Sequence, residues 1–307
     1  MEMDSLFTSY FTGWIDLYKR GAVRPVTLSK YETSLKRLTQ IAPMLTMAAL
    51  DKRAYQGILN SYAQTHERQT TLNFHHHLRA ALLDAVDEGI LEHDPTRRAV
   101  VKGTVSRHHS AKFLSIAQLK QLFSVLDLSG RPIWDHFIYV VAKTGLRFAE
   151  ALGLTPDDFV SDCGAVKVSK TWDYKSPVPG FAPLKNKAST RTLTLDQSTR
   201  KLVRRMVADV PHEQPIFVYP GYRVFNEIAN KQLHRLCVQA GVPPISMHGL
   251  RHTHASILLY AGVSVASVAR RLGHANMTTT QRVYLHIIEE LEAQDNEKVI
   301  RCLQDLG

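Results

Sequence analysis

The chain has 307 residues, of which 44% are hydrophobic and 21% are charged, so it is long enough for two domains with separate cores. Its net charge of +10 points to a polyanionic partner, nucleic acid first and an acidic membrane surface second, although a basic surface with no partner accounts for the charge about as well. No run of about 18 apolar residues is present, so we expect no membrane span. The N-terminus lacks the basic start of a signal peptide, and the three scattered cysteines form no disulfide framework. We therefore expect a cytoplasmic protein.

The chain up to Gly89 has the periodicity of amphipathic helices. Apolar side chains recur at helical spacing from Leu28 to Leu38 and again from Phe74 to Val86, and Gly89 follows the second stretch as a helix end would. We therefore predict a helical bundle for a first domain over residues 1–105.

A basic segment follows this bundle. From Pro95 to Leu126 there is no acidic residue, and residues 99–112 have no clear apolar period, which predicts a linker between domains, placed at residues 106–114. Such a linker suits contact with a phosphate backbone, although a merely solvated linker is the alternative. The residues expected to contact DNA here are Arg97, Arg98, Lys102, Arg107 and Lys112.

The second domain is expected over residues 115–307. The capping-box pair Ser115 and Gln118 restarts helical structure, and helices are predicted over 115–126, 131–145 and 147–154. Short alternating segments between residues 157 and 195 predict a small antiparallel sheet, and helical periodicity returns from about 197. The predicted fold class is mainly α: a helical bundle followed by a mostly helical α+β domain.

Five short segments of the second domain carry residues suited to phosphate chemistry. Arg147 opens a helix in TGLRFAEALGL, and residues 183–195 are interpreted as a β-hairpin with Lys185 and Lys187 near its tip. His248 and Arg251, three residues apart in HGLRHTHASILL, share one helix face. Two further segments place His274 after a helix-ending glycine and Tyr284 at the edge of an apolar helix stripe. Each residue alone is more often a surface or core residue, and a tyrosine at such an edge normally packs in the core.

In combination, these segments resemble the tyrosine recombinase (phage integrase) family. The T-G-L-R-x-x-E-x-L-x-L pattern, the H-x-L-R box, the L-G-H triplet and a tyrosine ten residues beyond it occur in order and at family-like distances. The resemblance spans roughly residues 110–290 and, more weakly, about 5–100, where the family has a helical DNA-clamping domain. By this resemblance, the catalytic residues are Tyr284, Arg147, Lys185, His248, Arg251 and His274.

The residue types also suit the reaction that the resemblance implies. Two arginines, Arg147 and Arg251, are able to hold the non-bridging oxygens of a phosphate as negative charge builds up. A tyrosine hydroxyl with a pKa near ~10 needs help to lose its proton. His248 is the expected proton acceptor, and His274 is expected to bind the phosphate or orient Tyr284.

The general acid is expected from residues 183–195, here called the lysine segment because it contains Lys185 and Lys187. A lysine there is able to protonate the departing 5′ oxygen. Lys185 stands six residues before Arg191, which is the spacing of the family's K-x-x-x-S-x-R element. Lys187 remains an alternative for this role and is also expected to contact DNA.

The resemblance implies a site-specific recombinase of a prokaryote, phage or mobile element. Tyr284 would attack the scissile phosphate to give a 3′-phosphotyrosyl link, and four protomers would exchange strands of two duplexes through a Holliday junction. No cofactor or ATP is required, and accessory DNA-bending proteins are possible partners. The C-terminal segment from Asp295 onwards is expected to pack either on a neighbouring protomer or on its own domain.

Two further expectations concern features outside the catalytic segments. The clamp-like pattern begins at Phe7, so no additional arm-binding domain is expected before it. The histidine runs 75–77 and 108–109 do not predict a metal site, because successive side chains of a helix point in different directions. We expect no bound metal.

Three alternative functions remain open at this point. A type IB-like topoisomerase would use the same tyrosine chemistry without a partner duplex. A catalytically silent DNA-binding regulator would keep the fold, although such a protein would need only the arginines of the pocket. A helical RNA-binding protein is the more distant alternative.

Overall fold

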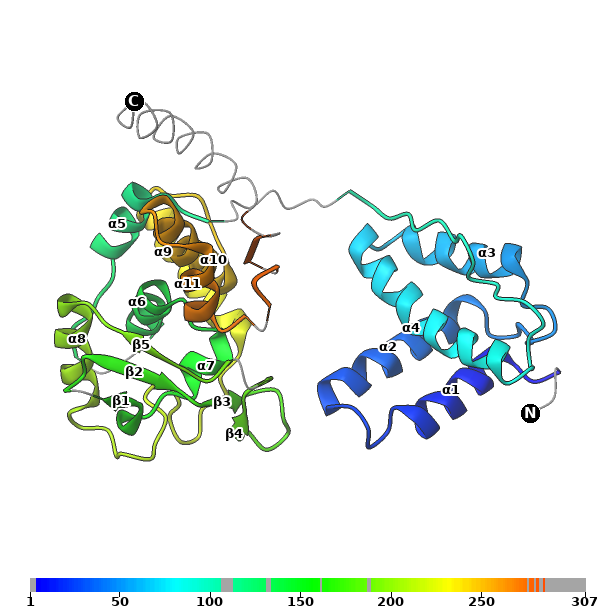
Figure 1. Cartoon of the computed structure of the whole chain (residues 1–307), viewed down its shortest axis with the longest axis horizontal. Helices are drawn as coiled ribbons and strands as arrows, with labels where there is room; N and C mark the ends of the chain where they lie inside the picture. The colour runs from blue at the N-terminus through cyan, green and yellow to red at the C-terminus, as the bar shows by residue number, and fades with distance from the viewer. Residues whose placement is uncertain are drawn as a thin grey trace, which may run out of the picture. The chain divides into compact units, whose positions relative to one another are not determined.

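The computed structural model describes residues 4–105, 113–130, 134–160, 162–186, 189–274, 276–278, 280, 281 and 284. The chain divides into two compact units, Met1–His109 and Ser110–Gly307 (Figure 1). The first unit is helical, and the second combines helices with small antiparallel sheets, so the predicted fold class is confirmed. None of the described helices is both long and apolar enough to cross a membrane.

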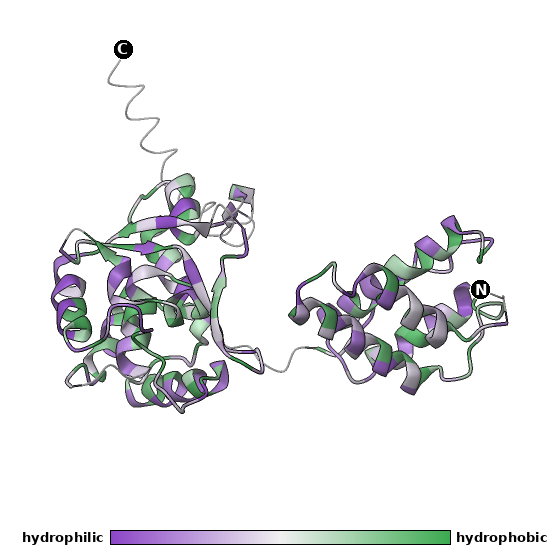
Figure 2. Cartoon of the chain, turned by 90° about the horizontal axis from the view of Figure 1, so that it is seen from below, coloured by the Kyte–Doolittle hydropathy of each residue, from purple (hydrophilic) through white to green (hydrophobic). Residues whose placement is uncertain are grey.

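Four helices form the described part of the first unit: α1 (Phe7–Tyr18), α2 (Pro25–Ile41), α3 (Lys52–Ala63) and α4 (Arg68–Asp87). Their apolar faces meet in a core that includes Phe11, Trp14 and Leu78. The polar end of the buried Trp14 ring is satisfied, because its Nε1–H donates to Asp84 at 2.6 Å. Hydrophilic and hydrophobic residues alternate along the helices, as expected of helices that cover a core (Figure 2).

The segment after α4 runs back over the unit instead of leaving it. Gln56 of α3 accepts from Val100 N–H and donates to Val100 O, both at 2.9 Å, and Thr104 N–H donates to His66 O at 2.9 Å. The approach is closest at Gly103, where a Cβ would lie 2.1 Å from the backbone nitrogen of Arg68. Residues 98–104 therefore lie against α3 and the start of α4.

The second unit is built around α6 (Trp134–Thr144), which is buried on nearly every side. Its core is shared with α5 (Ile116–Ser124), α7 (Phe148–Leu152), α8 (Gln197–Val207), α9 (Asn226–Gln239) and α10 (Met247–Tyr260), and a 3-10 turn η1 follows α7 at Pro156–Asp158 (Figure 1). The last described helix, α11 (Val265–Leu272), packs against α10 and strand β5 (Arg191–Thr194). The predicted Ser115–Gln118 capping box starts α5. The three helices predicted between residues 115 and 154 correspond to α5, α6 and α7.

Two small antiparallel sheets lie between α7 and α8. One has the order β1 (Phe159–Val160), β2 (Ala165–Val168), β5 (Arg191–Thr194), and the other pairs β3 (Lys170–Asp173) with β4 (Gly180–Pro183). The interpretation of residues 183–195 as one hairpin was therefore wrong. Val166 of β2 pairs with Leu193 of β5, which buries both side chains in the core, whereas β4 pairs with β3. The residues between β4 and β5 connect two sheets.

Candidate active site

Arg147 is held at the start of α7 by a buried carboxylate. As the N-cap residue, it donates from Nη1 to Glu150 Oε1 at 2.6 Å and from Nη2 to Gly273 O at 2.8 Å. The other oxygen of Glu150 accepts from Arg191 Nη2 at 2.9 Å. Burial raises the pKa of Glu150, but the hydrogen bond from Arg191 and the charges of Arg191 and Arg147 outweigh it, so the net pKa is lowered. Glu150 is therefore ionised and lies between two guanidinium groups.

Arg251, on α10, is anchored by two backbone carbonyls, one just before Arg147 and one at the end of α11. It is 3% exposed, and it donates from Nη1 to Gly145 O at 2.6 Å and from Nη2 to Leu272 O at 2.7 Å. Burial and the charge of Arg147 lower the pKa of Arg251 to about 9, so the guanidinium stays charged at neutral pH. Because Gly273 and Leu272 are consecutive, both predicted phosphate-binding arginines are attached to the end of α11.

His248 and His274 are neutral at neutral pH. His248, on the first turn of α10, is accessible, yet the atoms packed around its ring and the charges of Arg251 and Arg147 lower its pKa. His274 follows Gly273, which ends α11 with a φ of +67°, and its Nδ1 lies 2.7 Å from Thr280 Oγ1. Burial and the neighbouring arginines, Arg251 first, lower the pKa of His274 to about 4. Each imidazole therefore retains a nitrogen able to accept a proton.

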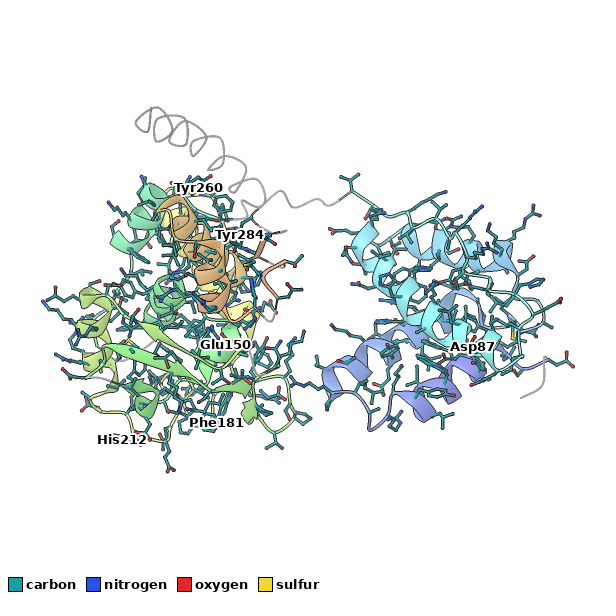
Figure 3. All side chains as sticks on the ribbon, viewed as in Figure 1. Asp87, Glu150, Phe181, His212, Tyr260 and Tyr284 are labelled. Carbon is teal, nitrogen blue, oxygen red and sulfur yellow. The ribbon has the colours of Figure 1, made fainter. Side chains whose placement is uncertain are left out.

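Tyr284 is buried beside α10 and α11 (Figure 3). It is 2% exposed and packs with Leu259 and Leu272 in a small apolar cluster. Burial raises the pKa of Tyr284 to about 12, against the opposing charge of Arg251. Its hydroxyl lies 2.8 Å from Nδ1 of His252.

His252 is a residue of this site that sequence reasoning missed. It follows Arg251 directly and stands four residues after His248, so it shares the His248 face of α10. The ring centroids of His248 and His252 are 4.6 Å apart at near-perpendicular orientation, and those of His252 and Tyr284 are 5.7 Å apart. The i, i+4 spacing was the signal that would have included it.

The lysine segment joins the site at one end. Arg191 donates from Nε to Arg271 O at 2.6 Å, so the start of β5 is attached to α11. Lys185 is exposed in the connection between β4 and β5, and among the described residues its ammonium group has no hydrogen-bond partner. Lys187 lies outside the described residues. The choice of general acid thus remains a prediction.

The basic residues predicted to contact DNA are partly described. Arg98 and Lys102 line an open groove of about 820 Å³ in the first unit together with Lys52 and Arg53 of α3. Arg97 is exposed next to this groove, and Arg107 and Lys112 lie outside the described residues. Within the described part of the chain, no group of three His, Cys, Asp or Glu side chains is placed to hold a metal ion.

The model of the phage integrase family matches residues 112–290 of this chain, which therefore belongs to that family. The chain is 24% identical over 226 residues to the ICEBs1 integrase of Bacillus subtilis strain 168, a match that covers 70% of this chain and 61% of that integrase. This chain thus spans less than two thirds of that relative.

Solved structures of integrases share the fold. The integrase of the transposon Tn1549, solved with transposon right-end DNA, superposes with a TM-score of 0.77 at 19% identity and covers 91% of this chain and 95% of that chain. A lambda integrase tetramer bound to a Holliday junction superposes with a TM-score of 0.66 at 15% identity, covering 89% and 79%.

Proposed function

We propose that this protein is a site-specific DNA recombinase that integrates, excises or otherwise rearranges a mobile element. The observation that carries the proposal is the placement of two backbone-anchored arginines, Arg147 and Arg251, next to the cluster that holds Tyr284. Fixed guanidinium groups stabilise a phosphorane-like transition state better than mobile ones, because they need no reorganisation as charge develops. Family membership supports the same reading.

In the proposed reaction, Tyr284 Oη attacks the scissile phosphate, and the bond from phosphorus to the 5′ oxygen breaks. The product is a 3′-phosphotyrosyl link and a free 5′-hydroxyl, which takes its proton from Lys185 or Lys187. The 5′-hydroxyl of a partner strand then attacks the link and releases the tyrosine. The bond energy is conserved in the link, so the reaction needs no ATP.

Double-stranded DNA is the proposed partner, contacted by both units. The groove is lined by Lys52, Arg53, Arg98 and Lys102 against one acid, Asp51, so its net positive charge fits a phosphate backbone and supports the assignment of residues 1–105 as a DNA-clamping domain. Residues 106–114 are the proposed linker, and residues 115–307 are the proposed catalytic domain. By analogy with the lambda integrase tetramer on a Holliday junction, we propose that four protomers act on two duplexes in a bacterial cytoplasm.

A covalent capture assay tests this function. Duplexes that tile the DNA flanking the protein's own gene, each with a nick near the candidate position, are incubated with wild-type protein and with Tyr284→Phe. We expect denaturant-resistant adducts on one short site with wild type and none with the variant, and recombinant products when two copies of that site share a plasmid. Relaxation of plasmids that lack the site, without recombinants, would instead indicate a topoisomerase. Sequence-specific binding without any adduct would indicate a silent regulator.

A further inference from the structure

The hydroxyl of Tyr284 lies against a histidine outside the motifs by which the catalytic residues were predicted. His252 Nδ1 lies 2.8 Å from Tyr284 Oη. His274, the other imidazole expected near the tyrosine, uses its Nδ1 on Thr280 Oγ1 at 2.7 Å. His248, the expected proton acceptor, contacts the ring of His252. His252 is thus the imidazole in direct contact with the attacking atom.

The position of His252 on α10 is rigidly defined. The preceding residue, Arg251, is fixed by two backbone carbonyls. The following residue, Thr253, accepts from Leu114 N–H at 2.9 Å and donates to Gly249 O at 2.9 Å. Because both neighbours are anchored, the Cα of His252 has a fixed position, and from it the Nδ1 atom reaches the Tyr284 hydroxyl.

Proton removal is the chemical problem at this tyrosine. Burial raises the pKa of Tyr284 to about 12, so the phenolate is scarcely populated at neutral pH. The proton must therefore leave as the hydroxyl attacks, and an acceptor within hydrogen-bond distance is needed. In the tautomer with its proton on Nε2, His252 accepts at Nδ1, where the tyrosine hydroxyl lies.

We propose that His252 is the proton acceptor for Tyr284 in the strand-cleavage step. As the bond between Oη and phosphorus forms, the hydroxyl proton passes to His252 Nδ1. The bond from phosphorus to the 5′ oxygen breaks, and that oxygen takes its proton from the lysine general acid. In this scheme His248 lies beside His252 and near the two arginines, next to the phosphate. The inference rests on the proposed recombinase function and refines its first step.

Single-turnover adduct formation on the nicked site tests the role of His252. We expect His252→Ala to slow the adduct about 100-fold, within the range of a lost general base, with DNA affinity and melting temperature close to wild type. Added imidazole should restore the rate of His252→Ala in proportion to its concentration, because the truncated side chain leaves space for it. His234→Ala, which removes an exposed histidine of α9, is the matched control and should behave as wild type.

A second substrate distinguishes a defect in the attack by Tyr284 from a defect in protonation of the 5′ leaving group. A 5′-bridging phosphorothiolate has a thiolate leaving group that needs no proton, so the defect of His252→Ala should persist on it. Adduct formation by His252→Ala at or above the wild-type rate would overturn the inference. So would a defect of His252→Ala that disappears on the phosphorothiolate, because the histidine would then act on the leaving group. Full recovery in His252→Asn, together with no response of His252→Ala to imidazole, would also overturn it, because asparagine is not a base. Absence of adduct with wild-type protein would contradict the recombinase function itself.

Discussion

Glu150 determines the placement of two arginines, although it does not carry the chemistry itself. Its carboxylate is buried and accepts hydrogen bonds from the guanidinium groups of both Arg147 and Arg191. Removing one partner of a buried, hydrogen-bonded charge pair costs more than the pair itself contributes, because the remaining charge is left uncompensated. Here two cations would be left facing each other.

Glu150→Gln is therefore expected to lower both stability and activity. We predict a loss of about 3 kcal/mol in the free energy of unfolding in urea and slower adduct formation, because Arg147 loses its orientation. The matched control is Glu227→Gln, which breaks an exposed pair with Lys231 on α9 and should leave the unfolding curve close to that of wild type. Similar unfolding curves for the two variants would contradict the role given to Glu150.

Two lysines between β4 and β5 are candidates for the general acid. Lys185 is exposed there, and Lys187 lies outside the described residues. We predict that Lys185→Ala slows cleavage of ordinary DNA and regains near wild-type rates on the 5′-bridging phosphorothiolate, whose leaving group needs no proton. Lys187→Ala is the paired variant. If Lys187→Ala alone shows this recovery, Lys187 is the acid.

At the scale of elements, the end of α11 joins the parts of the site. The carbonyls of Arg271, Leu272 and Gly273 accept from Arg191, Arg251 and Arg147 respectively. Three arginines, from β5, α10 and the start of α7, thus donate hydrogen bonds to consecutive carbonyls at the end of α11. The left-handed conformation of Gly273 ends α11 and directs these carbonyls to their partners.

Substitution of this glycine is expected to disturb the site as well as the backbone. A Cβ at Gly273 would lie 2.8 Å from Arg191 Nη1, so Gly273→Ala should displace that guanidinium and lower the rate of adduct formation at least tenfold. Gly262→Ala is the matched control, since Gly262 also ends a helix, has a φ of +81° and has open space for a Cβ. Both should lose about 1 kcal/mol from backbone strain. Equal adduct rates would show that Arg191 is not displaced.

The elements also show what the sequence was able to predict. Helices α5 to α7, the capping box at Ser115 and the end of α11 at Gly273 follow from local signals, because caps and apolar periodicity act within one or two turns. The hairpin over residues 183–195 failed for the opposite reason. The partner of β5 is β2, more than twenty residues earlier, and no local pattern encodes that pairing.

The active site was predictable only in part, because local sequence patterns do not encode tertiary contacts. Ordered motifs named Arg147, His248, Arg251, His274 and Tyr284. The contact of His252 with the tyrosine hydroxyl depends on how the segment containing Tyr284 packs against α10, which is a tertiary property. The 2% exposure of Tyr284, in contrast, agrees with the apolar helix stripe at whose edge the sequence places it.

At the scale of the whole molecule, the charge of +10 has a candidate location. Lys52, Arg53, Arg98 and Lys102 line one groove of the first unit, and the Gln56–Val100 hydrogen bonds fix two of them by holding residues 98–104 against α3. Because the backbone of residues 98–104 is already held in place, less conformational entropy is lost when the groove binds DNA.

The salt dependence of DNA affinity measures the use of this groove. Removing one cation that neutralises a phosphate should reduce the slope of log affinity against log salt by about 0.9, so Arg98→Ala combined with Lys102→Ala should reduce it by about 1.8. Arg20→Ala is the control, because Arg20 is already paired with Asp16 and Glu32. An unchanged slope in the double variant would place the DNA elsewhere on the chain.

Mapping the residue that becomes joined to DNA tests whether Tyr284 is the nucleophile. The covalent complex formed on the nicked site is digested with trypsin and nuclease, and the nucleotide-bearing peptide is sequenced by mass spectrometry. We predict the peptide of residues 283–298, in which Tyr284 is the only tyrosine, with the nucleotide on that residue. Attachment within residues 252–270, where Tyr260 is the only tyrosine, or attachment at any other residue would contradict it.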